Sequence, residues 1–128
     1  MKRKLNILFS VVIFGLVFCA VPALAKETYN INGATIPANQ GAYSVSKYKS
    51  YSGYQALYSS SSGIDVQARL RHTVTPTWDT GWSSKLVIGG TMNWSSSAVS
   101  EAGIYPTLDI RATTKKSSTY KYSGIWFY

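Results

Sequence analysis

Alternation of apolar and polar residues with a period of two is the feature that most restricts how this sequence can fold. In the segment DVQARLRHTV, Val66, Ala68 and Leu70 fall on one side of an extended chain. Arg69 and Arg71 fall on the opposite side. Because the side chains of a β-strand point alternately to its two faces, this segment predicts a strand with one buried and one wet face.

The same period recurs along the chain and predicts an all-β fold. No segment keeps apolar residues at the helical period for three turns, and turn-rich pieces such as NGATIPANQG and SSSAVSEAG separate the extended runs. In the run KLVIGGTMNW, Leu86 and Ile88 share one side, and Gly89-Gly90 indicates a bulge or a close backbone approach. We expect about seven short strands in a small antiparallel β-sandwich or barrel. The expected strands lie at residues 28–31, 42–50, 54–59, 65–74, 85–94, 104–112 and 120–128.

The N-terminal segment has the layout of a secretory signal peptide. A basic run at residues 2–4 precedes an apolar run at 5–20, and the small-residue motif ALA follows at 23–25. We expect residues 1–25 to be a signal peptide that is cleaved, which leaves residues 26–128 as a single secreted, extracellular β-domain. The alternative is an uncleaved membrane anchor, for which the apolar run is barely long enough.

The chain has a single cysteine, Cys19, and it lies inside the expected signal peptide. A lipoprotein signal requires a small residue before its lipidated cysteine, and the large Phe18 departs from that pattern. The secreted domain is then free of disulfides and of thiol chemistry. The lone histidine, His72, falls on the apolar face of its strand, so we expect no metal site and no cofactor.

The chain ends on its most aromatic segment, YKYSGIWFY. Tyr120 and Tyr122 alternate with polar residues, as in a strand with one wet face. From Ile125 onward both faces are apolar, and strands of that kind are usually buried on both sides. We therefore expect a terminal core strand that closes the fold. The alternative is an exposed apolar surface that meets a partner.

Candidate catalytic residues are few. The triplet DTG at residues 79–81 resembles that of aspartic proteases, but Trp82 follows it in place of a small residue, and Asp, Thr and Gly are ordinary turn residues. We expect a turn at the triplet and no enzymatic activity. The alternative is a secreted hydrolase with an acidic site, aspartic-protease-like or glycosidase-like. The acidic residues that could pair in space, as glycosidases require, are Asp65, Asp79, Glu101 and Asp109.

Aromatic residues in polar surroundings are the clearest candidates for a binding surface. Trp78 and Trp82 flank a turn, and several tyrosines lie in a stretch otherwise rich in Ser, Lys and Gly. Flat rings with polar tips suit sugar rings, peptidoglycan and the membrane interface. The alternative is that the tyrosines pair across strands and stabilise a sheet. The predicted ligand-binding residues are Trp78, Trp82, Tyr48, Tyr51 and Tyr54, and Tyr58 lies further along the same stretch.

Positive charge is in excess but dispersed. The chain has 13 Lys and Arg against 5 Asp and Glu, and Lys115-Lys116 is the one basic pair beyond the expected signal peptide. Nucleic acids select a dense basic patch, so we expect no nucleic-acid partner. We expect a cell-wall glycan, an anionic envelope polymer or an envelope protein as the partner, and no stable membrane insertion after the signal peptide is removed.

A signal peptide, a Ser-, Thr- and Tyr-rich β-domain without cysteine, and a C-terminal run such as YSGIWFY resemble small secreted proteins of Gram-positive bacteria. The layout is similar to that of the lactococcin-type β-sandwich bacteriocins, which act on the cell envelope of competitors. The likeness covers the general layout and residues 120–128. This chain is longer and does not match the aromatic and glycine pattern of their N-terminal half, so no functional residues are carried over. The resemblance implies a non-enzymatic domain that binds or perturbs a bacterial cell envelope.

Overall fold

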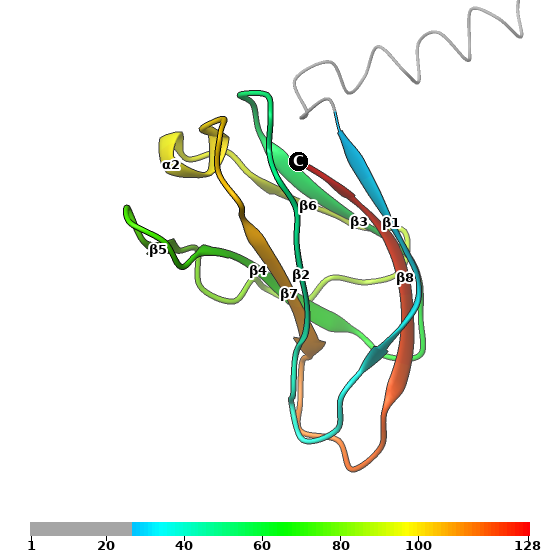
Figure 1. Cartoon of the computed structure of the whole chain (residues 1–128). Coiled ribbons are helices and arrows are strands. Elements are labelled where there is room, and N and C mark those ends of the chain that lie inside the picture. The colour runs from blue at the N-terminus through cyan, green and yellow to red at the C-terminus, as the bar shows by residue number, and fades with distance from the viewer. Residues whose placement is uncertain (1–26) are drawn as a thin grey trace, which may run out of the picture.

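A computed structural model describes residues 27–128, which form two antiparallel sheets of four strands each (Figure 1). The first, named the β8 sheet, has the strand order β1-β8-β3-β6, and the second, named the β4 sheet, has the order β2-β7-β4-β5. The predicted all-β antiparallel sandwich is confirmed, with eight strands in the described part of the chain instead of about seven. The elements are β1 (Thr28–Ile36), β2 (Tyr43–Ser46), β3 (Gln55–Ser62), β4 (Val66–His72), β5 (Trp78–Asp79), β6 (Thr91–Trp94), α2 (Ser97–Ser100), β7 (Thr107–Ala112) and β8 (Tyr120–Phe127).

The expected signal peptide, residues 1–25 with Cys19, lies outside the described residues and stays a prediction. Since the whole chain has one cysteine, an intrachain disulfide is excluded. Among residues 27–128, no helix is both long enough and apolar enough to cross a membrane.

Strands β4 and β7 form the centre of the β4 sheet and follow the predicted alternation. In β4, Ala68 and Leu70 are fully buried, whereas Arg69 between them points to the outer face. The register pairs Ala68 with Ile110 and Leu70 with Leu108, so the apolar side chains of both strands lie on the same side of the sheet. The period-two pattern of the sequence thus gives this sheet one face in the core and one face outside.

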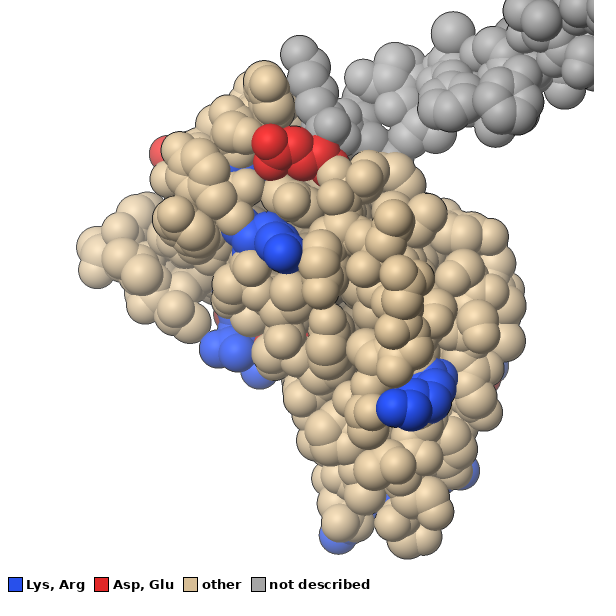
Figure 2. All heavy atoms as spheres, turned by 45° about the vertical axis from the view of Figure 1, so that its right-hand side comes forward, with Lys and Arg blue, Asp and Glu red and all other residues tan. Residues whose placement is uncertain are grey.

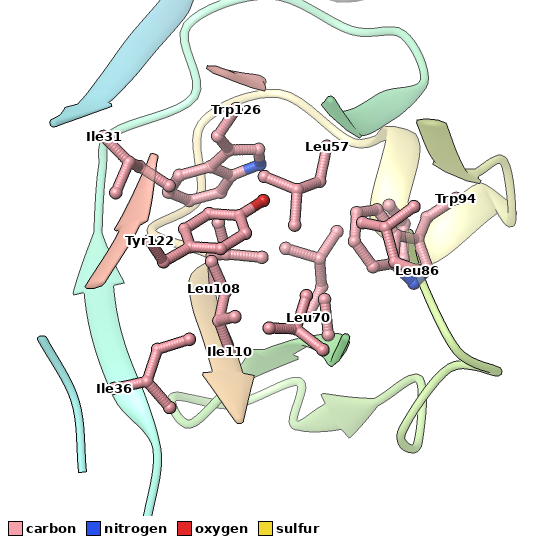
Figure 3. Packing of buried hydrophobic residues seen from close by; sticks show 13 residues of the cluster. Ile31, Ile36, Leu57, Leu70, Leu86, Trp94, Leu108, Ile110, Tyr122 and Trp126 are labelled. Atoms are coloured by element: carbon pink, nitrogen blue, oxygen red, sulfur yellow. The ribbon is translucent and has the colours of Figure 1, made fainter. Parts of the chain in front are cut away.

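The core lies between the two sheets, and its two largest fully buried side chains come from the C-terminal strand (Figure 3). Trp126 and Tyr122 project from β8 toward Leu57 of β3 and Leu108 of β7. The indole N–H of Trp126 donates a 3.2 Å hydrogen bond to the side-chain oxygen of Gln55, so its buried donor is satisfied. Burial of a large apolar side chain stabilises a fold by about 1.5–3 kcal/mol, which makes this aromatic pair a main contributor.

Strand β8 occupies a central position between β1 and β3, as the prediction of a closing core strand requires. Trp126 is completely buried on the inner face. The expected burial on both faces is wrong, because Ile125 and Phe127 point outward and are only partly covered. Their partners on the neighbouring strand β3 are Tyr58 and Ala56.

Gly124 allows β8 to lie close to β3. A Cβ atom at this position would stand 2.5 Å from the carbonyl oxygen of Tyr58 and 2.7 Å from the hydroxyl oxygen of Tyr122. The pairing of the two strands also shifts register between Ser59 and Ser61, which indicates a bulge beside this glycine. A side chain at position 124 would therefore force the two strands apart.

The run at residues 85–94 is a strand only in its second half, β6. Gly89 has a φ of +80°, a conformation that glycine adopts without steric cost. Its backbone N–H donates a 2.6 Å hydrogen bond to the carbonyl oxygen of Ser59, so the expected close backbone approach at the glycines is confirmed. The prediction that Ile88 shares a buried face with Leu86 is wrong, because the turn leaves Ile88 exposed while Leu86 enters the core.

Candidate functional site

Three chain segments that are far apart in the sequence meet at one end of the sandwich. They are residues 47–54 between β2 and β3, residues 101–106 between α2 and β7, and residues 73–77 between β4 and β5 (Figure 1). The first two are joined by backbone hydrogen bonds from Lys49 to Ile104, 2.8 Å, and from residue 103 back to Lys49, 2.7 Å. The second and third together line an open hollow of about 330 Å³.

This end of the molecule carries exposed aromatic side chains. Tyr48, Tyr51 and Tyr54 are between 44 and 49 % exposed, and Tyr105 is 62 % exposed. The rings of Tyr48 and Tyr105 are in contact, with their centroids 5.0 Å apart. We name the surface formed by these four tyrosines and the exposed Val74 the aromatic end. The three predicted tyrosines thus lie on one end of the fold, whereas Tyr58 belongs to β3 and is partly buried.

Strand parity explains why Tyr48 is outside. The alternation that buries the inner side of β2 continues past its end, so Lys49 turns inward and Tyr48 turns outward. Tyr105 follows from the same argument, because it shares the outward parity of Thr107 and Arg111 on β7. Tyr105 was not among the site residues predicted from the sequence, although its place on the outward-facing side of the strand pattern could have identified it.

Trp78 and Trp82 lie apart from the tyrosines, and both are partly buried. Trp78 on β5 packs against the core, and its ring centroid lies 5.9 Å from that of His72. Trp82 lies against the outer face of the β4 sheet, where the guanidinium groups of Arg69 and Arg111 stand 4.5 and 4.0 Å from its ring centroid. The five predicted residues therefore do not form one continuous surface.

A second hollow, of about 560 Å³, opens beside β4 and β5. Its size falls in the range of small-molecule sites in proteins, which is about 300–1,000 Å³. We name it the β4–β5 hollow. Its lining residues are Arg69, Arg71, Thr73, Thr77, Trp78 and Asp79, together with the buried His72.

A network of charged groups fixes one wall of this hollow. Asp109 of β7 is 1 % exposed and accepts hydrogen bonds from Arg69 Nε at 2.8 Å, Arg71 Nε at 2.6 Å and the Ser44 hydroxyl at 2.6 Å. Burial by itself would raise the pKa of Asp109, but the hydrogen bonds from Arg71, Ser44 and Arg69 outweigh it and hold this pKa below its usual value. Arg69 also bridges to Asp79 at 3.2 Å. The two arginine side chains are thereby held in place.

Asp79 of the DTG triplet lies in β5, and its side chain holds a local turn of the backbone after the strand. The backbone N–H of Gly81 donates a 2.7 Å hydrogen bond to the Asp79 carboxylate, and Gly81 has a φ of +72°. The Thr80 hydroxyl accepts a 3.0 Å hydrogen bond from the backbone N–H of Leu70, which ties the turn to β4. These residues extend the edge of the β4 sheet, so the triplet starts in a strand, and only its side-chain hydrogen bond has the form of the predicted turn.

The remaining acidic side chains are dispersed over the described part of the chain. Asp65 pairs with Lys85 at 3.6 Å, and Glu27 accepts a 2.6 Å hydrogen bond from Ser50. Glu101 lines the smaller hollow at the aromatic end. Between residues 27 and 128, no three His, Cys, Asp or Glu side chains gather as a metal ion would require.

A buried lysine supports the tyrosine-bearing segment, and sequence reasoning missed it. Lys49 is completely buried, and its ammonium group donates a hydrogen bond to the carbonyl oxygen of Tyr51. Burial lowers the pKa of Lys49, and the nearby charge of Glu27 opposes this shift in part. The ammonium group thus anchors the loop that carries Tyr48, Tyr51 and the start of β3.

The surface has no continuous basic region on the face that Figure 2 shows. There the side chains of Lys and Arg are separated by uncharged surface. The positive excess of the chain is therefore spread out on this face, in agreement with the dispersed charges of the sequence.

Comparison with known proteins supports the architecture. No family model and no curated protein matches the chain. A solved structure of the protein PirA is similar, with a TM-score of 0.50 and 8 % sequence identity, over 84 % of this chain and 99 % of PirA. At this identity the likeness shows the fold alone. The resemblance to lactococcin-type bacteriocins stays a prediction.

Proposed function

We propose that residues 26–128 act as a secreted, non-enzymatic module that binds a polymer of the bacterial cell envelope through the aromatic end. The observation that carries this proposal is the gathering of four exposed tyrosines from two loops at one end of the sandwich, where Tyr105 also lines the smaller hollow. Secretion rests on the signal-peptide pattern of residues 1–25, and a bacteriocin-like effect on the envelope is part of the same proposal.

The chemistry of the aromatic end supports binding of a polymer with both apolar and hydrogen-bonding surfaces. Tyrosine rings offer flat apolar area, and their hydroxyl groups donate and accept hydrogen bonds. They also lose little conformational freedom on binding, because the side chain has two rotatable bonds. The contact between Tyr48 and Tyr105 further limits the motion of both rings.

The alternative, a secreted hydrolase with an acidic site, has less support from the geometry. A glycosidase needs a carboxyl group that holds its proton at working pH, and therefore has a raised pKa. Asp79 and Asp109 are both bound to Arg69, and the pKa of Asp109 is lowered. A role in binding without turnover fits these carboxylates better.

A pull-down with purified sacculi, the cell-wall envelopes of Gram-positive bacteria, tests the proposal. The purified domain, residues 26–128, should sediment with sacculi, and the variant with Tyr48→Ser, Tyr51→Ser and Tyr105→Ser should not. The matched control is Val87→Ser with Ile88→Ser, because these exposed apolar side chains lie on the turn before β6. The control should bind like the original protein.

Two results would contradict the proposal. One is a tyrosine variant that keeps its thermal midpoint and also sediments with sacculi like the original domain. The other is release of soluble sugars or peptides from the sacculi by the purified domain, which would favour the hydrolase. A growth-inhibition assay on related strains then tells whether binding also perturbs the envelope.

A further inference from the structure

We infer that the β4–β5 hollow binds one uncharged sugar unit of the envelope polymer. The inference deepens the proposed function and rests on it, since it names the ligand class and a specific site, which shares the lining residue His72 with the smaller hollow at the aromatic end. Three properties of the hollow carry it: its balanced charge, its supply of hydrogen-bond donors and acceptors, and the indole ring of Trp78 in its wall.

The positive and negative side chains around the hollow neutralise one another. The guanidinium groups of Arg69 and Arg71 are matched by the carboxylates of Asp79 and Asp109, at distances from 2.6 to 3.2 Å. A site for a phosphate or a carboxylate would need unmatched positive charge near its ligand. The formal net charge of +5 for residues 26–128, with 10 Lys and Arg against 5 Asp and Glu, favours an anionic polymer, but this local balance favours an uncharged ligand.

The same side chains keep hydrogen-bond donors and acceptors that a ligand can use. Each guanidinium group has five N–H donors, and Arg69 and Arg71 each use two of them on the carboxylates. The side chain of Asp79 is 46 % exposed, so it keeps acceptor capacity, and the exposed Thr73 and Thr77 contribute hydroxyl groups. A sugar hydroxyl is donor and acceptor at once, so it can bind between a guanidinium and a carboxylate group.

The wall beside these groups is aromatic and held rigidly. Trp78 packs against the core and against the ring of His72, whose Nδ1 lies 2.9 Å from the carbonyl oxygen of Pro76. The face of a sugar ring is apolar at its C–H groups, and an indole ring offers a matching flat surface. Because Asp109 already fixes both arginines, a ligand would meet groups that are largely ordered before binding.

Filling the hollow tests the inference without disturbing the charged network. Thr77→Trp places a large ring at an exposed lining position, and Thr114→Trp is the matched control in the loop between β7 and β8 at the opposite end of the sandwich (Figure 1). Both variants should keep the circular dichroism and thermal midpoint of the original domain. Binding is then measured on sacculi before and after removal of their phosphate-containing polymers, at about 50 and about 500 mM NaCl.

The inference predicts that Thr77→Trp weakens binding at least about tenfold, which corresponds to about 1.4 kcal/mol, and that Thr114→Trp does not. It also predicts nearly equal binding on both preparations and at both salt concentrations. Binding by Thr77→Trp that equals the original, or binding that disappears with the phosphate polymers or with salt, would overturn the inference and leave the proposed function standing. No sedimentation of the original domain with either preparation would overturn the proposed function as well.

Discussion

The outer faces of the two sheets differ in charge, whereas their inner faces are alike. Around the C-terminal half of β8 the outer face carries Tyr58, Ile125 and Phe127, which are uncharged and partly covered, and the charged side chain of β8 on this face is the exposed Lys121 near the start of the strand. Around β4 and β7 the outer face carries charged side chains joined by hydrogen bonds, with Asp109 almost fully buried among arginines. Both inner faces, in contrast, supply apolar residues to one shared core (Figure 3).

This difference distinguishes the residues of the inner faces, which maintain the fold, from those of the outer faces, which can bind a ligand. The inner faces must match each other, because the core has to be filled without gaps. The outer faces have no such partner within residues 27–128, so their composition is free to vary. The charged outer face of the β4 sheet is more ordered than an ordinary wet surface, since its arginines are fixed by Asp109. An ordered polar surface beside an open hollow is suited to recognition.

The largest effect is expected for the inner face of β8. Trp126→Ala should lower the free energy of unfolding by about 3–5 kcal/mol, through lost transfer energy and the cavity left behind. Phe127→Ala, one residue further on the outer face, should cost less than half as much because Phe127 is only partly buried. Urea unfolding at neutral pH measures both values. Equal losses of unfolding free energy in the two variants would contradict the difference in burial between the inner and outer faces of β8.

The second effect concerns the buried carboxylate of the β4 sheet. Asp109→Asn removes the charge that both Arg69 and Arg71 bind and should cost about 3 kcal/mol, since breaking a buried ion pair leaves uncompensated charge. The control Asp65→Asn breaks an exposed pair with Lys85 and should cost less than about 1 kcal/mol.

The pH dependence of the free energy of unfolding is an independent test of how Asp109 contributes to stability. The folded pKa of Asp109 is lowered, so its contribution is fully present above the unfolded pKa of about 3.9 and is lost as the pH falls through the folded value. The original domain should therefore lose stability below about pH 4 more steeply than Asp109→Asn does. Equal acid slopes in urea unfolding at pH 2–7 would contradict this role.

Much of the fold follows from the sequence, because it depends on local alternation. The strands with a regular period of two, such as β4 and β7, were predicted with their buried faces. The exposure of the outer face of β8 was not predicted, because Ile125 and Phe127 are apolar and the sequence does not tell whether a further layer of the fold covers them. The exposed turn at Ile88 was missed because the glycines after it interrupt the alternation that places Leu86 in the core.

The candidate site was predicted in part. The tyrosines Tyr48, Tyr51 and Tyr54 were identified from their polar surroundings, and the structure gathers them at one end of the sandwich. The network around Asp109 and the burial of Lys49 could not be foreseen, because both depend on which strands become neighbours. Contacts such as that between Arg71 and Asp109 join residues far apart in the sequence, and one sequence does not reveal the register that brings them together.

The smallest effect is expected for Lys49, which supports the loop of the aromatic end. Burial lowers its pKa in the folded state, so the unfolded chain binds more protons between the folded value and about 10.4, and Lys49 makes stability rise with pH in that range. Lys49→Met should remove this rise and change stability at neutral pH by less than about 1 kcal/mol, because an apolar residue of similar volume often replaces a buried charged group at little cost. The comparison is made between the two proteins at each pH, because tyrosines also affect the alkaline slope. Burial and a hydrogen bond with Tyr29 raise the pKa of the partly buried Tyr43 to about 12, so the folded domain keeps a proton that the unfolded chain loses at about pH 10. An unchanged alkaline slope in the variant would contradict the burial of the ammonium group.

The central claim, that the ligand meets the aromatic end and the β4–β5 hollow, is tested most directly by nuclear magnetic resonance. The domain, labelled with ¹⁵N, would be titrated with soluble fragments of digested sacculi, and the shifts of its backbone and indole N–H signals would be followed. The account predicts shifts that concentrate in residues 47–54, 73–79 and 100–106 and in the indole signal of Trp78. Shifts centred on Ile125 and Phe127, on the outer face of the β8 sheet, would contradict it.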